Sequence, residues 1–152
     1  MENIYNHIRK ICNAIGNGFG DDKERRDKAL SVFEATINSM GDYINCVLYM
    51  ETGLQVARFR LEGQELRDRI MELDQRRRLA HDAMLGRVSA LNRICGMVGC
   101  EPFFAGDVAD RYKVADYAMT VTQALFVNRN QSSKQMSLED IQKVVEAKAD
   151  GE

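Results

Sequence analysis

A group of charged side chains in the middle of the chain has the residue types and the spacing of a polar site. Three of them recur every seven residues along an otherwise apolar stripe, and others follow a second stripe at three- and four-residue spacing. A charge at a buried position is costly unless it is paired. The pattern therefore predicts either an ion-pair network or a ligand site formed by Glu51, Arg58, Glu65, Asp74, Arg77, Arg78, His81 and Asp82.

The network interpretation follows from a chain reversal at Gly63. In an antiparallel hairpin centred there, facing residues lie at equal distances from the turn. Arginine suits such a network because its planar guanidinium binds a carboxylate through two hydrogen bonds. We expect the network to fix the register of two helices through Glu51 with Arg77 or Arg78, Arg58 with Asp68, and Asp74 with Arg78.

The alternative is a divalent-metal-dependent phosphohydrolase or nucleotide-processing enzyme that uses the same carboxylates. His81-Asp82 is a dipeptide found in metal-dependent phosphohydrolases, but the chain has only one other histidine, His7. The Glu-x-x-His motif of di-iron bundles is absent. Paired acids at 62/65 and 107/110 resemble the magnesium motifs of helical pyrophosphohydrolases, although the second pair also suits a helix cap. We therefore expect no catalytic residue, no bound metal and no cofactor.

Charge balance argues against nucleic acid and membranes as partners. The 152 residues carry a formal net charge of −2. The arginine-rich segment 58–78 contains nearly as many acids as arginines, which is typical of a salt-bridged helix surface and not of a phosphate-binding track. No window has the length and apolarity of a membrane span or a signal peptide, so we expect a cytoplasmic protein with its four cysteines reduced.

Helical periodicity runs through almost the whole chain. Isoleucines predict a short helix that ends near residues 16–18, and Asp22 is a suitable cap for a long second helix. Its apolar segment 43–50 is expected to lie at the centre of the core. Gly63 separates it from a second long helix, whereas Gly41 is a weaker alternative break. Asp107 and Ser137 are predicted to cap two shorter helices, and Tyr112 falls on the apolar stripe of the first of these.

These elements predict an all-α fold: a helical bundle with two long antiparallel helices and three shorter ones. We expect a single domain over residues 1–152. It comprises an N-terminal arm at 1–20, a core at 21–127, a polar linker at 128–135 and a C-terminal capping helix at 137–148. The loop 99–106 contains Phe103 and Phe104, which either close one end of the bundle or form an exposed anchor for a partner.

Four runs of sequence resemble a bacterial family of small all-helical proteins that is known only as a domain of unknown function. They are RFRLEG at 58–63, the segment 73–82 with Arg77-Arg78 and His81-Asp82, LNR at 91–93, and the segment 106–116 with Asp110-Arg111-Tyr112. The resemblance covers about residues 43–120. It implies a bacterial source and an all-helical fold, with 1–42 and 121–152 as variable additions, and it implies no activity.

The length of the amphipathic helices favours a non-enzymatic interaction or self-assembly module. Two long helices in a chain of this size present more apolar surface than one short bundle covers. We expect the protein to associate with itself, and a dimer is the simplest closed assembly.

Overall fold

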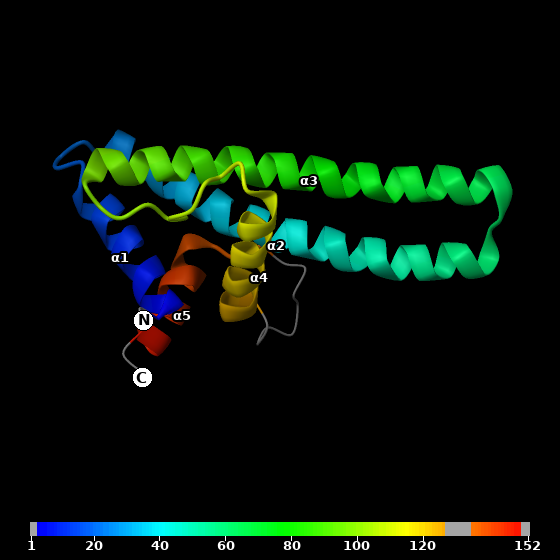
Figure 1. Ribbon diagram of the computed structural model, residues 1–152. Helices are drawn as coiled ribbons and strands as arrows, with labels where there is room; N and C mark the ends of the chain where they lie inside the picture. The colour runs from blue at the N-terminus through cyan, green and yellow to red at the C-terminus, as the bar shows by residue number, and fades with distance from the viewer. Residues whose placement is uncertain (1–2, 127–134, 150–152) are drawn as a thin grey trace.

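Five helices make up the computed structural model, which describes residues 3–126 and 135–149 (Figure 1). No strand occurs in this part of the chain, so the all-α prediction is confirmed. The predicted linker 128–135 lies, except for Gln135, outside the described residues. The helices are α1 (Ile4–Asn17), α2 (Lys23–Arg60), α3 (Gly63–Val98), α4 (Arg111–Phe126) and α5 (Leu138–Ala149).

The two long helices form an antiparallel hairpin. The 38 residues of α2 correspond to a length of about 57 Å at 1.5 Å per residue. The chain reverses where sequence analysis placed the turn, between Arg60 and Gly63. It does not break at Gly41, where the Phe126 ring of α4 lies 3.2 Å from the position a β-carbon would occupy. Glycine at this position therefore lets α4 approach α2 closely.

The three shorter helices pack together at one end of the hairpin, and the turn between α2 and α3 lies at the far end (Figure 1). Side-chain caps define where several helices begin. The Oδ1 atom of Asp22 accepts the Arg25 amide at 3.1 Å, and the hydroxyl of Ser137 accepts the Asp140 amide at 3.1 Å. Both caps were predicted, because such oxygens satisfy amides that the first turn leaves unpaired.

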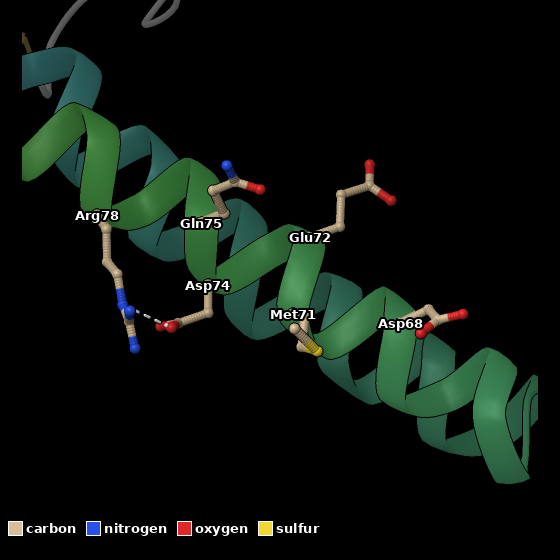
Figure 2. A pocket seen from close by; sticks show the side chains of 6 residues that line it. All are labelled: Asp68, Met71, Glu72, Asp74, Gln75 and Arg78. Atoms are coloured by element: carbon tan, nitrogen blue, oxygen red, sulfur yellow. Dashed lines mark ion pairs between the residues drawn. The ribbon is translucent and has the colours of Figure 1, made fainter.

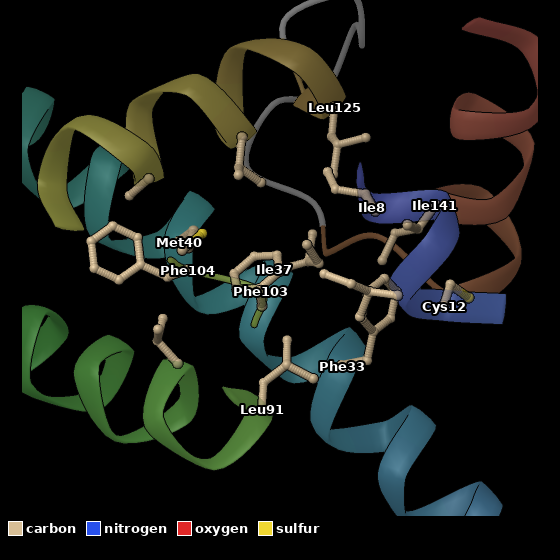
Figure 3. Close-up of a cluster of buried hydrophobic side chains, with 14 of the residues drawn as sticks. Ile8, Cys12, Phe33, Ile37, Met40, Leu91, Phe103, Phe104, Leu125 and Ile141 are labelled. Atoms are coloured by element: carbon tan, nitrogen blue, oxygen red, sulfur yellow. The ribbon is translucent and has the colours of Figure 1, made fainter. Parts of the chain in front are cut away.

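The hydrophobic core lies at this same end and draws on all five helices (Figure 3). Phe33, Ile37 and Met40 of α2 are fully buried. This corrects the expectation for residues 43–50, because Leu48 and Tyr49 in that segment are about half exposed. The helix is apolar on most faces there, but only the beginning of the segment, at Tyr43 and Ile44, belongs to the core.

Phe103 and Phe104 close one end of the core, as one of the two predicted alternatives requires. The side chain of Asn92 holds them in place. Its amide donates to the carbonyl oxygen of Phe104 at 3.0 Å, and its Oδ1 atom accepts the Phe104 amide at 3.0 Å.

Helix α4 begins later than predicted. Asp107 forms a separate turn, in which its carbonyl oxygen accepts the Asp110 amide at 2.9 Å, and Asp110 provides the side-chain cap for Lys113 at 3.2 Å. The core-facing side of α4 is also offset by one residue from the predicted stripe: Val114, Ala118 and Val121 are buried, whereas Tyr112 is 85% exposed. The prediction that Tyr112 belongs to the apolar stripe was wrong.

Candidate functional site

The hairpin extends beyond the core as a two-helix arm, which we define as residues 45–80 (Figure 1). Every residue of the arm is described, and only Ala57 and Leu73 in it are buried. Helices in proteins owe most of their stability to packing of an apolar face. An arm with two buried side chains in 36 positions therefore lacks the cover that the core provides elsewhere.

Large apolar side chains are exposed along the arm. On α2, Leu48, Val56 and Phe59 follow one face, and Thr52 completes it, so that the four residues lie at spacings of four, four and three. We call these four residues the α2 stripe. Phe59 is 91% exposed. Six of the eight large hydrophobic residues that are exposed in the described chain belong to the arm: Leu48, Tyr49, Val56, Phe59, Met71 and Leu79.

The α2 stripe continues a face that α4 covers nearer the core. Gly41 of α2 lies against Phe126 of α4, and Ile44 lines a pocket between the two helices. Leu48, the first residue of the α2 stripe, lies at the edge of the same pocket. A mainly apolar pocket of about 370 Å³ lies at this junction. Its walls are α2 and α4, with Met119 and Phe126 contributed by the latter. The exposed stripe is thus an extension of an existing helix-packing surface.

Tyr49 links the two helices of the arm. Its hydroxyl lies 3.2 Å from the donating Nη2 atom of Arg69, and the guanidinium of Arg76 lies over its ring at 5.6 Å from the centroid. The hydrogen bond from Arg69 lowers the pKa of the Tyr49 hydroxyl, and the positive charge of Arg69 acts in the same direction. The side of the arm where Tyr49 meets Arg69 and Arg76 is therefore polar.

The polar residues singled out in the sequence do not form the expected network between α2 and α3. Glu51, Arg58 and Glu65 are exposed, and among the described residues no ion pair joins Glu51 to Arg77 or Arg78. Glu51 lies on the solvent side of α2, so its carboxylate can remain hydrated without a partner. The predicted pairing of Glu51 across the hairpin was therefore wrong.

The ion pairs that do form run along α3. Asp74 binds the guanidinium of Arg77 at 2.9 Å and that of Arg78 at 2.8 Å, the second being the pairing that four-residue spacing predicts. The hydrogen bond from Arg77 lowers the pKa of Asp74, and the charges of both arginines act in the same direction. One carboxylate thus serves two arginines.

The hollow beside Asp74 and Arg78 is a surface feature of a single helix (Figure 2). It has a volume of about 530 Å³, and all its lining residues, from Asp68 to Arg78, belong to α3. In Figure 2 the side chains of Glu72 and Gln75 extend away from that of Asp74. No second element of the described chain supplies a facing group, so this hollow lacks the convergent polar groups of a ligand site.

The residues proposed for a metal site are not brought together. His81 is buried, and its Nδ1 atom lies 3.7 Å from the carboxylate of its exposed neighbour Asp82. Across residues 3–126 and 135–149, no group of three or more His, Cys, Asp or Glu side chains is arranged to hold a metal ion. The geometry of the described chain therefore gives no support to the metal-dependent enzyme.

A third, smaller pocket, of about 240 Å³, brings together residues of three helices. Tyr43 of α2, Arg77 and His81 of α3, and Arg111, Tyr112 and Ala115 of α4 line it. The segments 73–82 and 106–116 both belong to the family resemblance, and this was the one sequence feature that pointed to both of them. Their proximity depends on how α4 crosses the hairpin, and periodicity within each helix does not contain that information.

No helix in the described part of the chain has both the length and the apolarity needed to cross a bilayer.

Comparison with known protein families places the chain in one of them. The model of a family described as "Protein of unknown function (DUF3232)" matches residues 3–131. The matched region includes α1 and the whole of α4, so the expectation that residues 1–42 are a variable addition was wrong. No curated protein and no solved structure matches the chain.

Proposed function

Because the chain belongs to the DUF3232 family of proteins of unknown function, we propose its role from geometry: it is a self-association module that dimerises through the α2 stripe. Two copies pack their α2 arms against each other in antiparallel orientation.

One observation carries the proposal. The face of α2 that packs on α4 continues for three further turns as an uncovered apolar stripe, which ends at the almost fully exposed Phe59. Exposed apolar surface of this kind, continuous with a packed interface and bordered by charged residues, is typical of a protein-binding surface.

The stripe is complementary to a second copy of itself. A two-fold axis beside Gly53 and Leu54 places Leu48 opposite the second copy's Phe59, and it places Thr52 opposite the second copy's Gln55. Each contact then occurs twice, as an isologous interface requires. Phe59 of the second copy also comes close to the apolar pocket that Leu48 borders.

Charge complementarity supports the same arrangement. Glu51 and Arg58 lie on one flank of the stripe, seven residues apart, and both are exposed. In an antiparallel helix pair, residues on matching flanks face each other. The two-fold axis therefore brings Glu51 of each copy to Arg58 of the other. Two residues that lack a partner within the described chain gain one in the dimer.

The expected affinity is moderate. Burial of Leu48, Val56 and Phe59 from both copies contributes on the order of 10 kcal/mol, since each large apolar side chain contributes about 1.5–3 kcal/mol. The loss of translational and rotational freedom offsets part of this gain. We therefore expect a dissociation constant roughly in the micromolar range.

Charge reversal tests the arrangement. Glu51→Arg and Arg58→Glu each turn two attractive pairs into repulsive ones, a change of about 2 kcal/mol that weakens the dimer about 30-fold. The double variant restores opposite charges at both pairs and returns the dissociation constant to near the wild-type value. Analytical ultracentrifugation at several concentrations measures all four proteins.

Two outcomes contradict the proposal. A wild-type protein that remains monomeric at concentrations well above micromolar excludes the dimer. A double variant that is as weakened as either single variant shows that Glu51 and Arg58 do not face each other, and the antiparallel register is then wrong.

A further inference from the structure

The pocket between α2, α3 and α4 is separate from the α2 stripe. Its volume is about 240 Å³, below the range of about 300–1,000 Å³ that is typical of sites for drug-sized ligands. Its lining contains two arginines, two tyrosines and a histidine but no acidic residue. This composition fits a small anion.

His81 provides a second indication of a ligand. The residue is 3% exposed, and the ring of Tyr43 packs edge-on against it with 5.4 Å between centroids. Its Nε2 atom is buried and has no hydrogen-bond partner among the described residues. Buried polar atoms in native proteins almost always have a partner, and each exception calls for an explanation. An oxyanion bound in the pocket that His81 lines would accept a hydrogen bond from this atom.

The charged side chains that line the pocket are all basic. Arg77 and Arg78 share the single carboxylate of Asp74, and Arg111 is exposed with no ion pair among the described residues. The carboxylate of Asp82 lies 3.7 Å from the Nδ1 atom of His81, and that of Asp110 caps the beginning of α4. None of these three acids lines the pocket, so the lining itself is positively charged.

The beginning of α4 positions two residues of the pocket. Arg111 and Tyr112 are the first two residues of the 16-residue helix, and both line the pocket. Asp110 satisfies the amides of Lys113 and Val114 and so holds this end of the helix in place. The guanidinium of Arg111 is therefore the group that α4 offers to an anion.

We propose that this pocket binds the phosphate group of a small phosphorylated molecule, held by Arg77, His81 and Arg111 with the tyrosine hydroxyls as further donors. The donors come from three helices and approach from different directions. A phosphate group offers oxygens in a tetrahedral arrangement that can meet such donors, whereas the two oxygens of a carboxylate lie in one plane. Phosphate binding by this chain is independent of the proposed dimer.

Titration of the full chain with inorganic phosphate tests this proposal. Isothermal titration calorimetry at constant ionic strength, set with chloride, gives the dissociation constant, and NMR of the histidine side chains reports on His81. We expect saturable binding that shifts the His81 ring signals. Arg111→Gln should raise the dissociation constant about tenfold, the loss expected for one charge-assisted hydrogen bond.

Arg93→Gln is the matched control. Arg93 is an exposed arginine of α3 outside the pocket, and its substitution removes the same charge. We expect its dissociation constant to equal that of the wild type. Equal weakening by both variants indicates nonspecific attraction and overturns the proposal, as does the absence of saturable binding. Acetate that binds as tightly as phosphate overturns the assignment to a phosphate group.

Discussion

Leu73 occupies the space that the missing side chain of Gly53 leaves. Its Cδ1 and Cδ2 atoms lie 3.0 Å and 3.2 Å from the position that a β-carbon would take on Gly53. Leu73 is one of the two buried residues of the arm. This contact therefore fixes both the distance and the register between α2 and α3 where no other helix supports them.

A larger side chain at Gly53 should separate the two helices of the arm. In Gly53→Val the added methyl groups compete with Leu73 for the same space, and overpacking of this kind costs about 1–3 kcal/mol. We expect the free energy of unfolding to fall by this amount. Chemical denaturation at a fixed protein concentration measures it.

Gly86→Ala is the matched control, because no atom lies within 4 Å of the position of its β-carbon. It replaces a mid-helix glycine of α3 and should raise the free energy of unfolding by about 1 kcal/mol. An equal and favourable effect of both substitutions would show that Leu73 does not pack against Gly53.

The hairpin itself could be predicted because its information is local. The apolar stripes of α2 and α3 have helical spacing, and Gly63 lies at the reversal. The register was also accessible, since Gly53 and Leu73 lie at nearly equal distances from the turn. What the pattern did not reveal is which part of a stripe is covered. Leu48 and Ile44 have the same apolar character, but only Ile44 lies within reach of the packed core.

The polar contacts that hold the short elements could not be predicted for a related reason. A periodic pattern of apolar residues does not identify Asn38 or Asn92 as structurally important. Each of their side chains nevertheless forms hydrogen bonds with a backbone amide and a backbone carbonyl of a distant segment. Their partners, Met136 and Phe104, are set by tertiary packing. The phosphate pocket depends on tertiary packing in the same way.

Removal of the Asn38 side chain should destabilise the protein strongly. Its Nδ2 atom donates to the Met136 carbonyl oxygen at 2.8 Å, and its Oδ1 atom accepts the Met136 amide at 2.7 Å. In Asn38→Ala both backbone groups lose their partner in a buried environment, at a cost of about 3 kcal/mol. Chemical denaturation should show this loss. Asn45→Ala, on the same helix, should have little effect, because Asn45 makes no side-chain hydrogen bond within the described chain. If both variants lose a similar amount of unfolding free energy, the role of Asn38 is contradicted.

Alkaline conditions should destabilise the fold through Cys95. Burial raises the pKa of its thiol from 9.0 to about 12, and the neighbouring Cys100 adds to the shift. Above pH 9 the unfolded chain loses the proton that the folded protein retains. This contribution to stability is thus complete below pH 9, and it falls by about 1.4 kcal/mol per pH unit until the pH reaches about 12.

The variant Cys95→Ala isolates this effect. Its free energy of unfolding, measured from about pH 8 to about pH 11, should decline less steeply than that of the wild type by up to about 1.4 kcal/mol per pH unit. Parallel pH profiles for the two proteins would show that the thiol of Cys95 titrates alike in the folded and unfolded states.

The most direct test of the proposed function is the mass of the protein in solution when Phe59 is changed. We expect sedimentation equilibrium at tens of micromolar, roughly the range that the estimated affinity requires, to give twice 17.3 kDa for the wild type. Phe59→Ser should give the monomer mass, whereas Met97→Ser, at an exposed apolar residue outside the arm, should remain a dimer. A Phe59→Ser protein that dimerises as tightly as the wild type would contradict the α2 stripe as the dimer interface.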